Sequence, residues 1–254
     1  MKYKNILLTA CNDAYYTACL TLISHTQQLP VFQHIDQIIV YNLGMTEKEI
    51  DYLNKLEKVT VKFFGKDTKE FFPGYLDPKT YAWKMYVLHD AKNLATNCIF
   101  YLDSGVVPVF DFTEVYDKIE ETGKFLVGSL HKIGEHISDA CKIKMNVTEN
   151  ELKAEAITAG IQGYKIGSYY ECQYIDVGFY LSQIPECICG NKYGENPHRH
   201  DQTIYSILAN RLKITKFEDL YKYSGWLNPH MIPEQIFWVH RRNYINFERL
   251  KFQT

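Results

Sequence analysis

The stretch NCIFYLDSGVVPVF, residues 97–110, places a carboxylate where a predicted core strand ends. Residues 98–102 form a continuous apolar run, which is typical of a strand buried on both faces. Asp103, Ser104 and Gly105 follow at once, and a second apolar run then begins. An aspartate in this position either closes a turn with its own side chain or belongs to a site. Taken alone, the motif favours the turn.

The segments around this strand alternate between strand and helix patterns. We expect strands at residues 5–11, 37–41, 59–64, 98–102 and 125–129, and helices at 14–27, 46–56, 78–95 and 113–121. The helix at 46–56 opens with the capping-box pattern of Thr46 and Glu49. Such alternation favours an α/β fold with a parallel sheet and helices on both faces. Ligands bind beyond the carboxyl ends of such strands, which favours the site interpretation of Asp103.

The second half of the chain is less regular. We expect strands at residues 157–164, 173–181 and 214–217, a loop with a short helix at 131–156, and an amphipathic helix at 200–212. No linker, repeat or low-complexity segment interrupts the 254 residues. The chain is therefore expected to form a single domain.

Composition excludes several classes of protein. The chain is 46% hydrophobic and 23% charged, which is ordinary for a globular protein, and its net charge is −2. This balance gives no electrostatic reason to expect a nucleic acid or an anionic membrane as partner. No apolar run reaches the roughly 18 residues of a membrane span. The opening MKYKNILLTACND has too short an apolar segment for a signal peptide and is interpreted as the first strand.

Cysteine and tyrosine usage adds two expectations. The seven cysteines are an odd number and, without a secretion signal, favour a reducing cytoplasm. No second cysteine pair follows Cys187-Ile-Cys189, which makes a structural zinc site the less favoured interpretation of this pair. The 20 tyrosines indicate either a biased coding sequence or a polar-tipped aromatic surface suited to sugars. Both interpretations stay open.

Four further motifs carry polar or small residues at places where a site could form. LLTACND (7–13) ends the first strand on Asn12 and Asp13, and FPGYLDPKTYAWK (72–84) brings Lys84 to a helix start. AGIQGYKIGS (159–168) offers glycines that let a backbone approach a ligand closely. HRHDQTIYSIL (198–208) begins a helix with Asp201 and Gln202. Each motif by itself is weak evidence for a functional site, but the order of the motifs along the chain is more specific evidence.

In this order the motifs resemble those of nucleotide-sugar-dependent glycosyltransferases of the GT-A fold. The nearest pattern is that of the glycogenin and bacterial lipopolysaccharide galactosyltransferase group, and it extends over roughly residues 3–240. YLDSG (101–105) stands where that family has an Asp-x-Asp motif, and TYAWK (80–84) resembles its donor-binding helix. TAGIQGYK (158–165) resembles an acceptor-side strand of the family, and HDQTIYSIL (200–208) its Asp-Gln helix start.

The resemblance implies a role for each candidate residue. Asp201 and Gln202 are the implied catalytic residues, which contact donor-sugar hydroxyls near the anomeric carbon. The implied donor-binding residues are Asn12, Asp13, Lys84, Asp103, Ser104 and Gly105, with Asp13 on the ribose or base. Residues 1–130 then form the nucleotide-binding half of the domain, and residues 131–254 the acceptor half. Two blander interpretations stay open: Asp201 as a helix N-terminal acid and Lys84 as a surface lysine.

The chain departs from the resembled pattern at the metal site. The family holds a divalent metal, usually manganese, with two carboxylates, but the third position of the motif here is Gly105. The resemblance implies Asp103 and His240 as ligands of Mn²⁺ or Mg²⁺, with donor diphosphate oxygens completing the set. His230 is the second choice for the histidine. Cationic side chains can carry part of the phosphate charge instead, and the candidates are Lys84, Arg241 and Arg242.

The expected activity is transfer of a sugar from a nucleoside diphosphate, with UDP favoured, to a glycan, lipid-linked or protein acceptor. If the enzyme inverts, Asp201 is the candidate base; the resemblance leans towards retention, which needs no protein base there. We expect a cytoplasmic enzyme, with peripheral attachment at the inner membrane face as a variant of this prediction. One rival is a sugar nucleotidyltransferase, which normally carries a glycine-rich loop after the first strand, whereas TACNDAYY (9–16) has no glycine. The other is a non-catalytic carbohydrate-binding or scaffold protein, which the missing second carboxylate favours.

Overall fold

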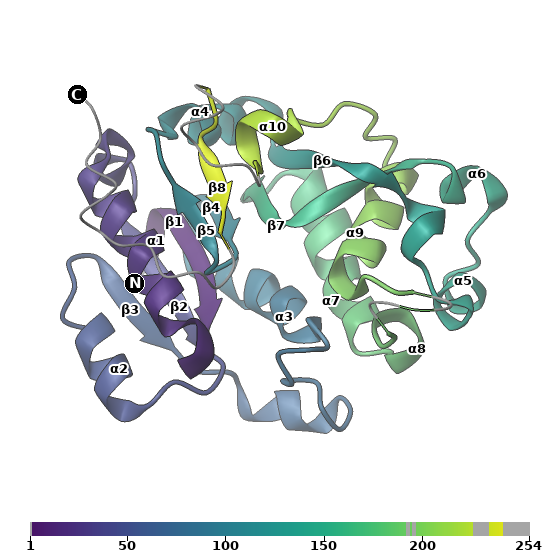
Figure 1. Ribbon diagram of the computed structural model, residues 1–254, viewed down its shortest axis with the longest axis horizontal. Helices are drawn as coiled ribbons and strands as arrows, with labels where there is room; N and C mark the ends of the chain where they lie inside the picture. Colours follow the sequence, from purple (N-terminus) through teal and green to yellow (C-terminus); the bar gives the residue numbers. More distant parts are fainter. Residues whose placement is uncertain (1, 192–193, 195–196, 226–233, 241–254) are drawn as a thin grey trace.

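A six-stranded sheet lies at the centre of the protein (Figure 1). The computed structural model describes residues 2–191, 194, 197–225 and 234–240. The strands follow the order β3-β2-β1-β4-β7-β6 across the sheet. Their bounds are β1 (Tyr3–Cys11), β2 (Gln37–Asn42), β3 (Val59–Lys62), β4 (Ala95–Leu102), β6 (Lys124–Lys132) and β7 (Glu155–Lys165). A separate pair, β5 (Val106–Pro108) and β8 (Phe237–Val239), is antiparallel.

Strand direction divides the sheet into two parts. β3, β2, β1 and β4 run parallel to one another, whereas β7 is antiparallel to both β4 and β6. The predicted mostly parallel sheet flanked by helices is therefore confirmed. β7 comes from the second half of the chain but lies between β4 and β6. Both halves of the chain thus contribute strands to one sheet, and the single domain stays a prediction.

Both faces of the sheet are covered because its strands are apolar at successive positions. In β4, Ile99 and Tyr101 pack into one core, while Cys98, Phe100 and Leu102 pack into the other. Side chains along a strand point alternately to opposite faces, so an unbroken apolar run buries both. The helices that form the two covering layers are α1 (Tyr16–Gln28), α2 (Glu47–Leu53) and α4 (Thr113–Thr122) on one face, and α3 (Ala82–Ala91), α7 (Val177–Ser182) and α9 (His200–Arg211) on the other.

Shorter helices complete the molecule. They are α5 (Asp139–Lys144), α6 (Glu149–Leu152), α8 (Pro185–Ile188) and α10 (Leu220–Tyr223). The predicted capping box of α2 is present, since Thr46 accepts from the backbone N–H of Glu49 and the Glu49 carboxylate accepts from that of Thr46. No helix among the described residues is long and apolar enough to cross a membrane.

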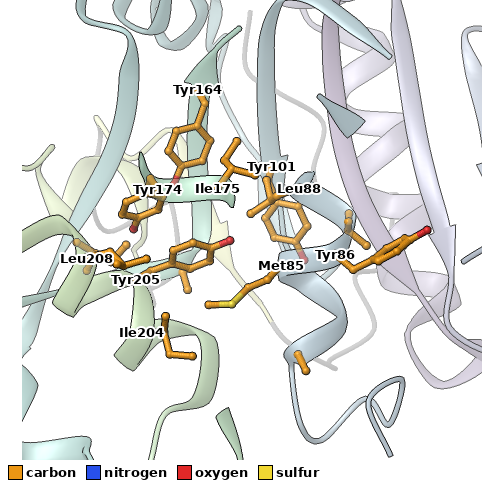
Figure 2. Close-up of a cluster of buried hydrophobic side chains, with 14 of the residues drawn as sticks. Met85, Tyr86, Leu88, Tyr101, Tyr164, Tyr174, Ile175, Ile204, Tyr205 and Leu208 are labelled. Carbon is orange, nitrogen blue, oxygen red and sulfur yellow. The ribbon is translucent and has the colours of Figure 1, made fainter. Parts of the chain in front are cut away.

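Tyrosine is a core residue in this protein. Figure 2 shows Tyr101, Tyr164, Tyr174 and Tyr205 among the buried side chains between the sheet and its helices. The rings of Tyr174 and Tyr205 stack with centroids 4.6 Å apart. The Tyr164 hydroxyl donates to Gln162 at 2.6 Å, which satisfies a polar tip inside the core. Much of the tyrosine excess therefore fills the interior rather than a sugar-binding surface.

Three predicted elements differ from the structure. Residues 173–181 are helical, with a π-helical turn at Glu171–Asp176 leading into α7, because buried positions there recur at helical spacing. A Cβ on Gly178 would lie 2.8 Å from the Tyr205 ring, so this glycine admits the neighbouring helix. Residues 214–217 form no strand. The helix predicted at 78–95 begins only at Ala82, because Tyr81 has a left-handed backbone (φ 55°).

Candidate active site

A pocket of about 610 Å³ lies at the carboxyl ends of the parallel strands. Residues at or just after the ends of β1, β2 and β4 line it, as expected for an α/β sheet. The antiparallel β7 contributes the middle of its length, residues 158–161, because its Ile161 pairs with Leu102 at the end of β4. The end of β6 adds residues 129–131, and the start of α9 adds residues 200–202.

A buried lysine joins two carboxylates at the wall of this pocket. Lys84 Nζ lies 2.9 Å from Oδ1 of Asp103 and 2.9 Å from Oδ2 of Asp201. The Lys84 side chain is only 2% exposed and that of Asp201 only 5%, while Asp103 is 40% exposed. The structure thus brings together three predicted site residues that are up to 117 positions apart in sequence. The surface-lysine interpretation of Lys84 is wrong.

The charge of this cluster is set by its geometry. Burial by itself would lower the pKa of Lys84, but the two carboxylates outweigh it and raise that pKa above its ordinary value. Lys84 is therefore an ammonium ion at neutral pH. Oδ2 of Asp201 meets the ammonium at ion-pair distance but outside hydrogen-bond angles, and no other described group donates to it. This oxygen is hidden from solvent and is held by the ion pair with Lys84.

Two left-handed residues aim the helix starts at the pocket. Tyr81 precedes α3 with φ 55°, and His200 opens α9 with φ 49°. Neither is a glycine, so each conformation carries strain that the surrounding packing must support. Their rings stack on each other with centroids 5.5 Å apart, and both residues line the pocket. Lys84 follows Tyr81 by one helical turn and Asp201 follows His200 directly, so this contact brings the ion pair together.

Asp103 is held from three directions. Its Oδ1 accepts from the Tyr101 hydroxyl at 2.8 Å as well as from Lys84, and its backbone N–H donates to the carbonyl of Gly160 at 2.8 Å. Its carbonyl accepts from Val106 N–H at 2.9 Å, which closes the turn into β5. Asp103 therefore closes the turn with its backbone carbonyl, while its side chain joins the ion pair at the pocket wall. Its role as a site residue stays a prediction.

Gly160 makes room for that carboxylate. A Cβ built on this glycine would lie 2.6 Å from Oδ2 of Asp103. The sequence predicts that small residues in this segment let a ligand approach the backbone. In the structure it is the protein's own carboxylate that takes the space beside Gly160.

The other predicted donor-binding and catalytic residues line the pocket, except for Asp13. Asn12, Ser104, Gly105 and Gln202 line the pocket. Asn12 also accepts from the Tyr15 N–H at 3.2 Å and so caps the turn that leads into α1. Asp13 is exposed and is not among the lining residues, so its contact with ribose or base stays a prediction.

A metal at Asp103 fits the residues present only in part. Oδ1 of Asp103 is occupied by Lys84 and Tyr101, which leaves Oδ2 as one hard oxygen ligand. The backbone N–H of His240 donates to the Gly105 carbonyl at 3.0 Å, which brings this histidine to the edge of the motif. Its imidazole packs against Trp238, and burial lowers its pKa, so it is a neutral potential ligand. His230, Arg241 and Arg242 lie outside the described residues.

Sequence reasoning missed several residues of the pocket. Tyr101 stands two positions before Asp103, so strand alternation could have placed both on one face. The buried Thr158 hydroxyl lines the pocket and has no hydrogen-bond partner among the described residues. Arg199 and His131 line it too, with Arg199 Nη2 3.3 Å from His131 Nε2. No local signal predicts that contact, because it joins β6 to the segment before α9.

Comparison with solved structures decides the fold. A galactosyltransferase, LgtC, solved with donor and acceptor sugar analogues, superposes with a TM-score of 0.53 and 16% identity over 80% of this chain and 70% of its own. The chain has a GT-A glycosyltransferase fold. Two more GT-A neighbours are mouse xyloside xylosyltransferase 1 (TM-score 0.53, 11% identity, 96% of this chain and 100% of its own) and the core-mannan synthase CmsA/Ktr4 of Aspergillus fumigatus. The latter, described as a Mn/GDP form, has a TM-score of 0.54 and 9% identity over 82% of this chain and 70% of its own.

The likeness to GT-A structures lies in the fold rather than in the sequence. No protein-family model matches the chain, and no curated protein matches its sequence. The predicted resemblance to LgtC-like galactosyltransferases is thus confirmed by three-dimensional structure, at identities too low to carry a residue's role from one protein to another.

Proposed function

We propose that the protein is a glycosyltransferase that moves a sugar from a nucleoside diphosphate, with UDP favoured, to a glycan, lipid-linked or protein acceptor. The observation that carries this proposal is the Lys84 ammonium held between Asp103 and Asp201 in a pocket at the carboxyl edge of a GT-A sheet. A turn aspartate and a helix N-terminal acid would have no reason to share a buried cation in a pocket wall.

Sugar transfer requires groups that stabilise the charges developing on both sides of the breaking bond. Cleavage of a sugar–phosphate bond develops positive charge at the anomeric carbon and extra negative charge on the diphosphate. In our proposal Asp201 and Gln202 contact donor-sugar hydroxyls beside that carbon, and Lys84 orients Asp201 through their ion pair. Asn12 and Asp13 contact the nucleoside, and Ser104 and Gly105 line the path of the diphosphate.

A divalent metal would supply a further cation for the diphosphate. We propose that Oδ2 of Asp103 and the imidazole of His240 would hold Mn²⁺ or Mg²⁺ together with donor oxygens. When bound, the metal would neutralise charge that develops on the leaving diphosphate. The cytoplasmic location and the UDP preference remain predictions of the sequence, as does the division into nucleotide and acceptor halves.

The first experiment is a panel of nucleotide sugars with Mn²⁺, read by detection of released nucleoside diphosphate and by thermal shift. We expect one nucleoside diphosphate to raise Tm and its sugar conjugate to be turned over. Asp103→Asn should abolish metal-dependent donor binding and lower turnover roughly 10²–10³-fold, as loss of a preorganised electrostatic group does. Its circular dichroism should match that of the wild type.

Asp51→Asn is the matched control, because Asp51 is an exposed carboxylate on α2. It should leave donor binding and turnover unchanged. If no nucleoside diphosphate shifts Tm and no sugar is released, the non-catalytic scaffold interpretation is favoured instead, which the glycine at position 105 already supports. If Asp103→Asn unfolds the protein, Asp103 acts only as a turn residue.

A further inference from the structure

Two histidines and a glutamate converge at the end of β6, where His131 lines the pocket. His131 lies near the end of β6, and Glu135 and His136 lie in the 3-10 turn Ile133–His136. One ligand atom from each of the three lies within 4.8 Å of the others. Within the described part of the chain, this is the only group of three histidine, cysteine or acidic side chains that converges in this way.

The protonation state of the cluster suits a metal. His131 Nδ1 lies 3.2 Å from the Glu135 carboxylate, while its Nε2 faces Arg199, which can only donate. His131 therefore carries its proton on Nδ1 and donates it to Glu135. The hydrogen bond from His131 lowers the pKa of Glu135, which is thus ionised. Burial, and then the charge of Arg199, lower the pKa of His136, so its imidazole is neutral.

His136 is the unexplained member of the group. Both of its ring nitrogens are hidden from solvent, and neither has a hydrogen-bond partner among the described residues. A buried polar group without a partner is destabilising, and native proteins rarely keep one without a reason. Its ring meets that of His131 edge to face, with centroids 4.7 Å apart.

The backbone under His136 is firmly anchored. Its carbonyl accepts from the Arg199 N–H at 3.2 Å and from the Thr203 hydroxyl at 2.8 Å. The flanking residues Ile133 and Ile137 are each only 2% exposed. The imidazole is therefore presented by a fixed main chain that is tied to the start of α9, rather than by a loose loop.

We propose that His131, Glu135 and His136 form a transition-metal site, with Zn²⁺ the best-suited ion. Two imidazole nitrogens and one carboxylate oxygen are a ligand set that zinc takes with an open fourth position. Imidazole ligands disfavour Mg²⁺ and Ca²⁺, which prefer oxygen. Asp103 is not among its ligands, and this proposal does not depend on the proposed sugar transfer.

Metal binding here would act on the pocket through Arg199. When the metal takes Nδ1 of His131, the imidazole proton moves to Nε2, which can then no longer accept from Arg199. The guanidinium has to turn away from His131, and Arg199 lines the pocket one residue before α9 begins. The bound ion and Arg199 therefore compete for the imidazole of His131. Metal binding changes the position of the guanidinium, and the guanidinium in turn weakens metal binding.

The test is a titration of tag-free, EDTA-treated full-length protein with Co²⁺, read by visible absorption, and with Zn²⁺, read by calorimetry. We expect one equivalent of each ion to bind, and excess Mg²⁺ not to displace Co²⁺. His136→Ala should weaken binding at least about tenfold, since even residues that only support metal ligands contribute that much. Glu135→Gln, a change at an exposed side chain that leaves the core untouched, should weaken it too.

Three further variants separate the outcomes. His34→Ala removes an exposed histidine far from the cluster in sequence and should bind Co²⁺ as the wild type does. Asp103→Asn should also bind Co²⁺ normally, which keeps this proposal distinguishable from the sugar-transfer proposal. Arg199→Met should tighten binding severalfold by removing the competing cation. The proposal is overturned if the wild type binds no stoichiometric Co²⁺, or if His136→Ala and Glu135→Gln bind it as tightly as the wild type.

Discussion

Lys84 sets the electrostatics of the candidate site at the scale of single residues. It is almost fully buried, and both of its carboxylate partners lie 2.9 Å away. One ammonium between two carboxylates leaves the cluster with a net negative charge, and the only strongly exposed member is Asp103. A developing positive charge in the pocket is thus favoured, while the burial of Lys84 and Asp201 makes the fold depend on the pairing of these two charges.

Removing Lys84 should therefore destabilise the protein. Lys84→Met leaves the buried Asp201 without a counter-ion, and breaking a buried pair from one side typically costs about 3–5 kcal/mol of unfolding free energy. The measurement is urea unfolding followed by circular dichroism. Adding Asp201→Asn to Lys84→Met should recover part of the loss, because it removes the uncompensated charge. A Lys84→Met variant within about 1 kcal/mol of wild type would show that the ion pair does not stabilise the fold.

β7 shows how one element serves both the site and the core. It lies antiparallel between β4 and β6 in the sheet. Two of its glycines leave space that side chains from different elements fill. A Cβ on Gly160 would lie 2.6 Å from Asp103, while a Cβ on Gly163 would lie 2.3 Å from Ile119 of α4. The same substitution at two positions three residues apart should therefore have different consequences.

Gly160→Ala should lower nucleotide affinity with little effect on stability, because the new methyl group forces the Asp103 carboxylate to turn. Gly163→Ala should instead destabilise by about 1–3 kcal/mol through overpacking against Ile119, and leave the affinity of the folded protein unchanged. Thermal-shift titration with nucleoside diphosphates and urea unfolding separate the two effects. Equal affinities in the two variants would mean that the position of Asp103 does not matter for the donor.

At the scale of the whole molecule, a buried histidine outside the pocket connects segments that are far apart in sequence. His198 is fully buried and joins distant segments, with Nε2 donating to the Cys187 carbonyl at 3.0 Å and Nδ1 accepting from the Ser138 N–H at 3.4 Å. The bond that Nδ1 accepts requires the neutral imidazole, because a protonated Nδ1 can only donate. His198 and His200 are both buried, and their rings contact the backbone carbonyls of Cys187 and Ile188 in α8.

Acid should destabilise the protein through this residue. Burial, and then His200, lower the pKa of His198 to about 4, whereas an unfolded histidine titrates near 6.5. Between these values the unfolded chain binds a proton that the folded chain does not, so stability falls as the pH drops from about 6.5 towards 4. The loss reaches about 3 kcal/mol.

The measurement is the unfolding free energy in urea between pH 7 and pH 4.5. His198→Asn should be less stable than wild type at pH 7 but should show a shallower decline across this range. His34→Asn, at an exposed histidine, should keep the wild-type decline. Parallel pH profiles for wild type and His198→Asn would contradict the assignment.

Local patterns determined much of this protein. Apolar runs with turn residues after them predict β1, β2, β3, β4 and β6, and the Thr46 box predicts α2, because side-chain period and capping depend on near neighbours in the chain. The order of short motifs also predicts Lys84, Asp103 and Asp201 as site residues. Their type and position after strands or at helix starts are visible without any tertiary contact.

Contacts between distant segments decided the rest. The antiparallel entry of β7, the helix at α7, the stacked left-handed pair Tyr81 and His200, and the convergence of His136 with His131 all depend on which surfaces meet. A short apolar run satisfies strand and helix patterns alike, and a residue adopts a strained backbone only when the packing around it outweighs the strain. The local sequence therefore determined most strands and helices and the types of the candidate site residues. Burial against segments far along the chain determined how these elements and residues are arranged.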